Sequence, residues 1–486
     1  MLFTIHAEKQ TGEKKVFTYD NMTNHLKSED GVVFEFTDIP PQHAHDIKRV
    51  SKDNPGNKST HINLIKIQMG LACNYSCEYC SQKFVERSES TTSKDVAPFM
   101  EKLNALEFSE ETGLKIEIWG GEPLVYMKTI KPLVEAIQDH FKEWEKKPQF
   151  SMITNGSLLN DETIDFLMEH NFTVSISHDG PGQAIRGPDP FDDPEKKETI
   201  LGFYRMMTRL KKGISFNSML SKRNMSRKEI SDWFIELTGD ENISLGEGSL
   251  VDAYDADGIQ NSLNTYAEHF EFRRKAFSDI YGADGKIAFK MQIDKINDFT
   301  HAVLSHRSAE GLGQKCGMDS ENTLAVDLNG NVLTCQNVSA AETAMNGESH
   351  KIGNLDDYAN VKLNTATHWS NRDECPACPV LHLCKGACMF LENKYWETSC
   401  ANAYSDNVAH FALSFSNMTG YIPVRIEGEG LPLDRQDIFG TLFDHPEKEA
   451  KKIIPIKIIS DVTNLDGVTV YEKARVSAWH FQVVDQ

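Results

Sequence analysis

The sequence predicts an α/β protein whose main domain, residues 61–252, is an open, partial (β/α)6 barrel of the TIM type. In this region short apolar runs alternate with amphipathic segments, which is typical of repeated βα units over a parallel sheet. About six such units can be counted, fewer than the eight that close a barrel. The chain also changes character at both borders, because it is polar before the region and rich in cysteine after it.

A plausible helix separates each expected strand from the next. The helix after the first strand is expected behind a Ser93 cap, because Val96, Phe99 and Leu103 recur at helical spacing. The second strand, in LKIEIWGGEP, runs directly into a glycine turn. The expected strands are residues 62–68, 114–120, 150–156, 172–180, 213–220 and 242–248.

The segments outside the barrel follow other patterns. Short β-like pieces such as Val32–Phe36 occur before it, and helices are expected at 262–281 and 288–307. A hairpin with a two-residue turn is expected at Asn329-Gly330, and strands joined at Asp466-Gly467 in the tail. The expected division is 1–60, N-terminal segment and linker; 61–252, barrel; 253–310, helical connection; 311–405, cysteine-rich domain; 406–486, C-terminal helix and β extension.

Composition excludes several classes of protein. Lys and Arg number 51 against 72 Asp and Glu, a net charge of -21, so binding to nucleic acid by counterion release is not expected. The N-terminus lacks a signal-peptide pattern and no apolar run is long enough to cross a membrane, which predicts a cytoplasmic, soluble protein. In that compartment ten clustered cysteines indicate metal rather than disulfides.

The first cysteine cluster is the loop CNYSCEYC, with Cys73, Cys77 and Cys80. Three thiolates on so short a loop can hold three irons of a 4Fe-4S cluster and leave the fourth iron open, whereas a structural zinc site takes four closed ligands. A zinc knuckle is the alternative. The triplet, the aromatic Tyr79 before its last cysteine and the preceding strand resemble the radical S-adenosylmethionine (SAM) superfamily.

This resemblance implies a cofactor site at the carboxyl ends of the strands. Gly120, Gly121 and Glu122 of the GGEP turn would meet the amino group of the cofactor's methionine, where glycines allow close approach and a carboxylate suits an ammonium. As an isolated motif, GGEP is an ordinary strand-to-helix turn.

Further residues follow from the same resemblance. Ser177 in SHDGP would lie near the ribose, and Arg186 would reach the cofactor carboxylate. Thr154 and Asn155 end the third strand on the same rim, although polar residues there are usually loop formers. We rank Ser177 above Arg186, and both above Asn155.

The seven later cysteines resemble the auxiliary-cluster extension called the SPASM/twitch domain, with a zinc ribbon as the alternative. The resemblance implies an outer 4Fe-4S cluster and an inner one that is short of one cysteine ligand. Met318, Asp319 or Asn322 stands where relatives have that cysteine, and Asp319, water or a substrate group could complete the site. The outer set is Cys375, Cys378, Cys384 and Cys400; the inner set is Cys316, Cys335 and Cys388.

Enzymes of this architecture mostly modify peptides, which predicts a maturase that crosslinks or otherwise oxidises a ribosomally made precursor peptide. The precursor is expected to bind as an added strand on the N-terminal segment or on the tail, and the resemblance implies an electron donor such as flavodoxin or ferredoxin. The alternatives are an anaerobic sulfatase-type maturase, a small-molecule radical SAM dehydrogenase, or a non-catalytic zinc or cluster protein.

Two observations bear on the chemistry. Gln336 and Asn337 follow the hairpin cysteine, where the sulfatase branch has an aspartate base, which speaks against that branch. No catalytic acid or base is assigned, because Asp319, Glu321 and Asp327 are expected to be ordinary solvated loop carboxylates.

Overall fold

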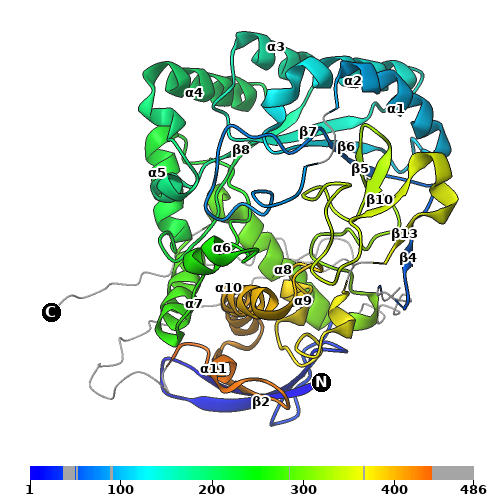
Figure 1. The fold of residues 1–486 in the computed structure, drawn as a ribbon. Helices are drawn as coiled ribbons and strands as arrows, with labels where there is room; N and C mark the ends of the chain where they lie inside the picture. The colour runs from blue at the N-terminus through cyan, green and yellow to red at the C-terminus, as the bar shows by residue number, and fades with distance from the viewer. Residues whose placement is uncertain (37–49, 51–52, 88–90, 284, 365–366, 441–486) are drawn as a thin grey trace.

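The computed structural model describes residues 1–36, 50, 53–87, 91–283, 285–364 and 367–440. Its centre is an eight-stranded sheet in the order β12-β11-β10-β5-β6-β7-β8-β9 (Figure 1). Neighbours from β10 through β5 to β9 are parallel, and the sheet is open, which confirms the predicted partial barrel. The strands are β5 Leu64–Gln68, β6 Lys115–Trp119, β7 Gln149–Thr154, β8 Thr173–Ser177, β9 Ile214–Asn217, β10 Thr323–Asp327, β11 Asn331–Leu333 and β12 Lys351–Asn354.

The first five expected strands are confirmed, but the sixth is wrong. Residues 242–248 run beside β9 with a single isolated bridge, between Phe216 and Leu245, and form no regular ladder. Gly246 and Gly248 interrupt this segment, and Gly248 has a φ of +59°, which is incompatible with extended backbone.

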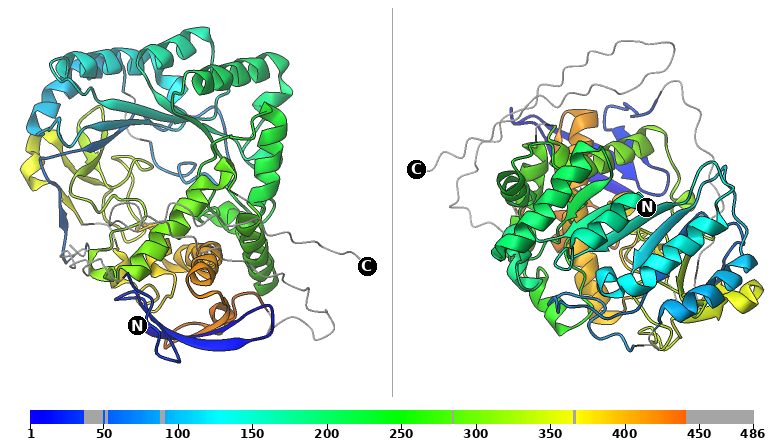
Figure 2. Two further views of the ribbon diagram at one scale, coloured as in Figure 1. Left: turned by 180° about the vertical axis from the view of Figure 1, so that it is seen from behind. Right: turned by 90° about the horizontal axis from the view of Figure 1, so that it is seen from above.

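Helices cover the outer face of the sheet, and a second group of helices lies across its other side (Figures 1 and 2). The helices expected at 262–281 and 288–307 are confirmed as α7 and α8, with shifted ends. The helices are α1 Val96–Lys102, α2 Met127–His140, α3 Asp161–Glu169, α4 Pro194–Arg209, α5 Arg227–Thr238, α6 Ala256–Asn261, α7 Tyr266–Tyr281, α8 Lys290–Leu304, α9 Leu381–Cys384, α10 Asn393–Thr419 and α11 Leu433–Gln436.

Polar side chains begin these helices by accepting hydrogen bonds from free backbone N–H groups. Asn160 caps α3, Asp193 caps α4 and Ser226 caps α5. The expected Ser93 cap is wrong by one residue. Thr92 is the cap, because it and Asp95 form a reciprocal capping box that starts a short 3-10 turn before α1.

The first part of the predicted N-terminal segment and linker, residues 2–28, forms three strands of a folded sheet. Three of its strands pair in the order β14-β1-β2-β3 with a strand from the other end of the chain. The piece Val32–Phe36 makes only an isolated bridge from Val33 to Lys27. Phe17 packs edge-on against Phe415 of α10, 4.9 Å between ring centroids, so aromatic burial holds this sheet in place. Its strands are β1 Leu2–Glu8, β2 Lys14–Asp20, β3 His25–Ser28 and β14 Ile422–Glu427.

Smaller elements complete the fold. A two-stranded sheet pairs β4 Gly56–Asn57 with β13 Lys362–Leu363. The hairpin β10–β11 is confirmed, but its register leaves three loop residues instead of two. Gly330 has a φ of +76°, and Asp327 accepts hydrogen bonds from Asn329 N and Asn331 N at 3.0 Å each, which fixes this turn.

The strands expected around Asp466-Gly467 lie outside the described residues. Within the described part of the chain, no helix is long and apolar enough to cross a membrane.

Candidate functional site

The CNYSCEYC loop lies just beyond the carboxyl end of β5. The backbone before Cys73 is fastened to the turn after β6, because Gly121 N donates to Gly70 O at 2.9 Å and Glu122 N donates to Ala72 O at 3.0 Å. A Cβ on Gly121 would lie only 2.5 Å from the Ala72 carbonyl oxygen. The glycine is therefore needed for the cysteine loop and the GGEP turn to approach each other.

Gly120, the first glycine of this turn, also lies close to the backbone of the loop before Cys73. A Cβ on Gly120 would lie 3.1 Å from Gly70 O. The close approach that the structure shows at Gly120 and Gly121 is thus to the protein's own backbone, and their contact with a cofactor stays a prediction.

Glu122 is buried, with a relative exposure of 2%. One carboxylate oxygen, Oε1, accepts hydrogen bonds from Leu124 N at 3.0 Å and from the Thr154 hydroxyl at 2.6 Å, and Oε2 accepts from Asn155 N at 2.8 Å. Burial raises the pKa of Glu122, while these donors act in the opposite direction. The carboxylate joins the end of β6 to the end of β7, which neither motif indicates by itself.

Asn155 connects β7 to the cysteine loop. Its Nδ2 donates to Asn74 Oδ1 at 2.9 Å, and its Oδ1 accepts from the Ser157 hydroxyl at 2.6 Å. Asn74 Nδ2 in turn donates to the Ser157 oxygen at 2.8 Å. The predicted rim residue Asn155 therefore fixes the residue that follows Cys73.

Asp179 is a site residue that sequence reasoning did not single out, although it stands in the same SHDGP segment as Ser177. Its fully buried carboxylate accepts hydrogen bonds from Arg186 Nη2 at 3.1 Å, from Met219 N at 2.9 Å and from the Tyr79 hydroxyl. The Arg186 guanidinium lies 5.7 Å from the centre of the Tyr79 ring. One carboxylate thus brings together Tyr79 and Arg186, which were predicted on separate grounds.

Ser177 is the last residue of β8 and is 7% exposed. The side chain of the next residue, His178, packs against other residues. Its ring stacks on the ring of Trp233, with 4.9 Å between the centroids, and its Nε2 lies 3.0 Å from Asp189 Oδ1. Ser177 therefore remains on the rim that carries the GGEP turn, and its contact with a ribose stays a prediction.

The cysteines of the first cluster differ in exposure, because Cys73 is exposed whereas Cys77 and Cys80 are half-buried. Burial raises the pKa of Cys73, and it raises the pKa of Cys77 to about 12 although the charge of Arg186 acts against this shift. Cluster binding requires the thiolate form of these cysteines, so it would release protons. Within the described ranges no three Cys, His, Asp or Glu side chains converge as they would on a single metal ion.

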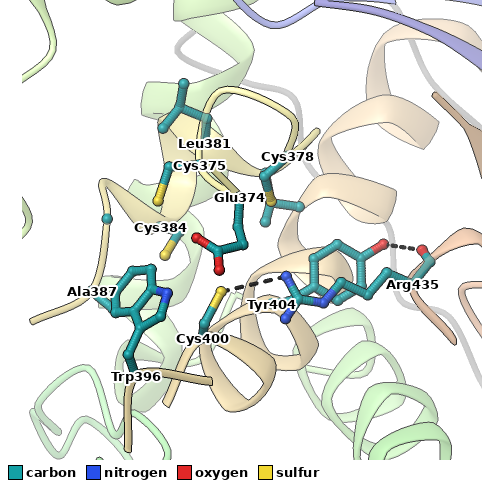
Figure 3. A pocket seen from close by; sticks show the side chains of 12 residues that line it. Glu374, Cys375, Cys378, Leu381, Cys384, Ala387, Trp396, Cys400, Tyr404 and Arg435 are labelled. Carbon is teal, nitrogen blue, oxygen red and sulfur yellow. Dashed lines mark hydrogen bonds between the residues drawn. The ribbon is translucent and has the colours of Figure 1, made fainter. Parts of the chain in front are cut away.

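The outer set lines one pocket with an empty volume of ≈ 330 Å³ (Figure 3). Cys375, Cys378 and Cys384 come from the loop before α9 and from α9 itself, and Cys400 comes from α10. The four sulfurs surround this space instead of meeting at one point, an arrangement that suits a multi-iron cluster better than a single zinc. Burial raises the pKa of Cys378 to about 12.

The inner set comes from three loops, because Cys316 precedes β10, Cys335 follows β11 and Cys388 follows α9. Burial and then the neighbouring Cys316 raise the pKa of Cys335 to about 12, and the pKa of Cys388 is also about 12 because of burial. Sequence reasoning missed Tyr254, whose hydroxyl forms a hydrogen bond with the Cys388 thiol. A tyrosine between the barrel and the helical connection carried no sequence signal for this role.

The candidates for the missing inner ligand have other partners. Met318 is completely buried in a hydrophobic cluster, and Asp319 accepts a hydrogen bond from Gln314 N at 2.9 Å and lies 3.6 Å from His368 Nε2. Asp319 is 11% exposed and Asp327 is buried in its turn, so the expectation that both are solvated is wrong.

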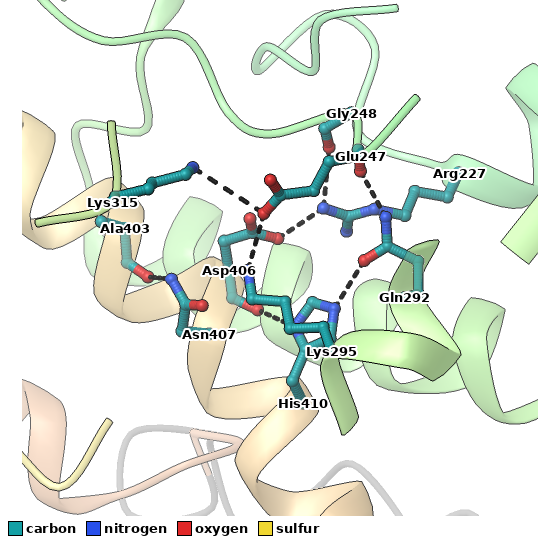
Figure 4. A network of polar contacts seen from close by, with 10 residues as sticks. All are labelled: Arg227, Glu247, Gly248, Gln292, Lys295, Lys315, Ala403, Asp406, Asn407 and His410. Carbon is teal, nitrogen blue, oxygen red and sulfur yellow. Dashed lines mark hydrogen bonds and ion pairs between the residues drawn. The ribbon is translucent and has the colours of Figure 1, made fainter. Parts of the chain in front are cut away.

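A network of charges, in which the pair Arg227–Asp406 is buried, joins the barrel to the cysteine-rich region (Figure 4). Glu247 Oε1 lies 2.7 Å from Lys295 Nζ and 3.8 Å from Lys315 Nζ, which directly precedes Cys316. Burial alone would raise the pKa of Glu247, but the two lysines hold it well below its usual range. Arg227 of α5 pairs with Asp406 of α10 at 2.6 Å. The contact of Lys315 with Glu247 links the residue before Cys316 to the end of the barrel segment.

Comparison with known proteins shows what this arrangement is similar to. Residues 67–215 match the family model of the Radical SAM superfamily. The radical SAM cyclopropyl synthase TigE of Paramaledivibacter caminithermalis is 24% identical over 390 residues, which cover 74% of this chain and 74% of that protein. A cysteine-type anaerobic sulfatase-maturating enzyme of Clostridium perfringens is 22% identical over 343 residues, which cover 65% of this chain and 85% of that protein.

A solved structure supports the fold. The His6-tagged enzyme anSMEcpe with bound AdoMet superposes with a TM-score of 0.52 at 17% identity, covering 74% of this chain and 98% of that one. The open parallel sheet, the three-cysteine loop after its first barrel strand and the family match agree with one another. Residues 67–215 therefore form a radical SAM domain.

Proposed function

We propose that this radical SAM enzyme holds three 4Fe-4S clusters and modifies a peptide or protein substrate by a two-electron oxidation. The observation that carries the proposal is the arrangement of the cysteines. One three-cysteine loop lies at the carboxyl rim of the sheet, and a separate pocket is lined by all four members of the outer set.

The chain's own groups fit SAM and a cluster at the rim. Cys73, Cys77 and Cys80 would hold three irons. A carboxylate has about four acceptor sites and Glu122 uses three, so Oε2 retains one for an ammonium. Arg186 Nε has no partner among the described residues and can donate to a carboxylate.

When bound, the cluster and SAM supply a 5'-deoxyadenosyl radical that removes a hydrogen atom from the substrate. The surrounding residues hold this site in shape. Asp179 fixes Tyr79 and Arg186, and Asn155 fixes the loop that follows Cys73.

The seven later cysteines support two auxiliary clusters. Each cluster would take four ligands, of which the outer set provides four and the inner set three. Lys315, the residue before Cys316, pairs with Glu247 at the end of the barrel segment, which links the inner set to the barrel. Such clusters suit the removal of a second electron from a substrate radical.

The names of the relatives support a peptide or protein substrate. One relative is a sulfatase-maturating enzyme, whose substrate is itself a protein, and another is a cyclopropyl synthase. Ring closure or crosslinking removes two hydrogen atoms, which fits an oxidation. A ribosomally made precursor peptide is the substrate that we propose, with flavodoxin or ferredoxin as the electron donor.

A sulfatase-type maturase is the second candidate, because several relatives carry that name. Gln336 speaks against it. This side chain is 9% exposed, its Oε1 lies 3.5 Å from the Cys335 sulfur, and its amide cannot act as a base. A small-molecule dehydrogenase on the same scaffold is the remaining alternative.

Mass spectrometry tests this proposal. Short precursor peptides encoded beside the gene are incubated with the anaerobically reconstituted enzyme, SAM and a reductant. We expect a peptide product about two mass units lighter, the loss of two hydrogen atoms. The variant with Cys73, Cys77 and Cys80 all replaced by alanine is the control and should leave the peptide unchanged.

Other products would contradict the proposal. An epimerised peptide of unchanged mass would argue against the oxidation. Formylglycine on a sulfatase peptide would replace the precursor by a sulfatase as substrate, in spite of Gln336.

A further inference from the structure

We propose that Arg435 raises the reduction potential of the outer auxiliary cluster by donating an N–H hydrogen bond and a positive charge to its ligand Cys400. This inference rests on the proposed function, because that proposal assigns a cluster to the outer set. Arg435 lies outside the cysteine-rich segment, after β14, and no sequence pattern pointed to it.

The contact is direct. Arg435 Nη1 lies 3.4 Å from the Cys400 sulfur, and the side chain lines the same pocket as the four cysteines (Figure 3). Below it, Tyr404 of α10 places its ring 5.4 Å from the guanidinium. The donor therefore reaches a ligand sulfur from the side of the pocket that α11 covers.

The backbone around Arg435 is fixed, so the guanidinium is not a mobile surface group. Arg273 of α7, which is 2% exposed, donates from Nη1 to Asp434 O at 3.0 Å and to Asp437 O at 3.1 Å. The Tyr404 hydroxyl donates to Arg435 O. Two buried side chains, Arg273 of α7 and Tyr404 of α10, thus hold the backbone carbonyl groups of residues 434, 435 and 437.

The charge of Arg435 acts mainly on sulfur. Among the described residues it forms no ion pair with a carboxylate, and Glu374, the acidic residue of the pocket, is exposed to solvent. Arg435 Nη1 instead approaches the sulfur of Cys400 at 3.4 Å. The guanidinium therefore stabilises negative charge on the sulfurs of the outer set.

The sign of the effect on potential follows from charge. Reduction adds one negative charge to a thiolate-ligated cluster, and a cationic hydrogen-bond donor at a ligand sulfur stabilises that charge. Arg435 therefore makes the outer site easier to reduce. Its proposed role is to set the reduction potential of the outer cluster, without contact with substrate.

A redox titration of the full-length, anaerobically reconstituted protein, followed by electron paramagnetic resonance, tests this role. In Arg435→Gln we expect the ratio of reduced to oxidised outer cluster at a fixed potential to fall at least tenfold, which is a shift of about 59 mV to lower potential for one electron. Arg435→Lys keeps the charge and should recover part of the shift. Arg425→Gln is the control, because Arg425 on β14 binds Glu427 and Gln436 and is not paired with a cysteine.

Iron content separates the two proposals. Loss of about four irons in Cys378→Ala shows that the outer cluster exists, and unchanged iron there overturns the proposed function. If that iron is lost but Arg435→Gln titrates like Arg425→Gln, the role of Arg435 is refuted. Loss of the outer cluster's iron from both Arg435→Gln and Arg435→Lys would also refute it, since the residue would then be needed for assembly.

Discussion

Replacing Gly121 with alanine is expected to displace the loop that carries the first cysteine cluster. The added Cβ would lie 2.5 Å from Ala72 O and 2.6 Å from Leu71 O. Both obstacles are backbone atoms one or two residues before Cys73, so no side chain can rotate away. Overpacking of this kind costs about 1–3 kcal/mol, and we expect the upper end because the chain itself must move.

Two measurements check this effect. Denaturant unfolding of the metal-free protein should show the loss of stability, and reconstitution should show fewer bound irons, because Cys73 moves. Gly202→Ala is the matched control: it lies inside α4, its Cβ would meet nothing closer than 3.9 Å, and alanine there should stabilise the protein by roughly 0.5–1 kcal/mol. Equal stability and iron content in the two variants would refute the reasoning.

Other perturbations give distinct results. Asp179→Asn should lower the free energy of unfolding by about 3–5 kcal/mol, because it leaves the Arg186 charge buried without its carboxylate. The exposed variant Glu162→Gln should show no measurable change in the same unfolding assay, and a similar result for both would contradict this. Cys378→Ala should still release 5'-deoxyadenosine in a chromatographic assay but form no modified product; normal product formation would argue against a role for the outer set. Burial lowers the pKa of His382 to about 4 from 6.5, so between these values only the unfolded chain binds the proton and stability falls as the pH falls. Urea midpoints at pH 7 and pH 5 measure this, and His382→Gln should lessen the difference; an identical pH dependence in that variant would contradict the assignment.

Local patterns in the sequence predicted much of the fold. The apolar runs of β5 to β9 are readable because a buried parallel strand is a short continuous apolar segment. The segment around Gly246 also contains apolar residues, Ile243 and Leu245, but it forms no ladder, since its glycines break the extended backbone. Strand pairing over long distances was not predictable. β1 pairs with β14 because both strands bury apolar side chains against α10. The alternation of polar and apolar residues in 1–60 does not indicate with which strand β1 pairs.

Part of the candidate site could also be predicted from local patterns in the sequence, and part could not. Cysteine spacing and the GGEP turn identified the loop, the rim and the outer set, because these signals are local. Asp179 and Arg435 were missed because their roles depend on contacts that the fold creates. Asp179 meets Tyr79 across 100 residues, and Arg435 meets Cys400 across 35. Gly121 was singled out for contact with the cofactor, which stays a prediction; its close approach to the backbone of Ala72 appears only in the fold.

The most direct test of the central claim is the iron and sulfide content of the anaerobically reconstituted protein. Three 4Fe-4S clusters predict about twelve irons and as many sulfides per chain. Replacement of Cys73, Cys77 and Cys80 by alanine should remove about four irons and abolish the reductive cleavage of SAM to 5'-deoxyadenosine. One or two zinc ions without sulfide, or unchanged cleavage in that variant, would contradict the account.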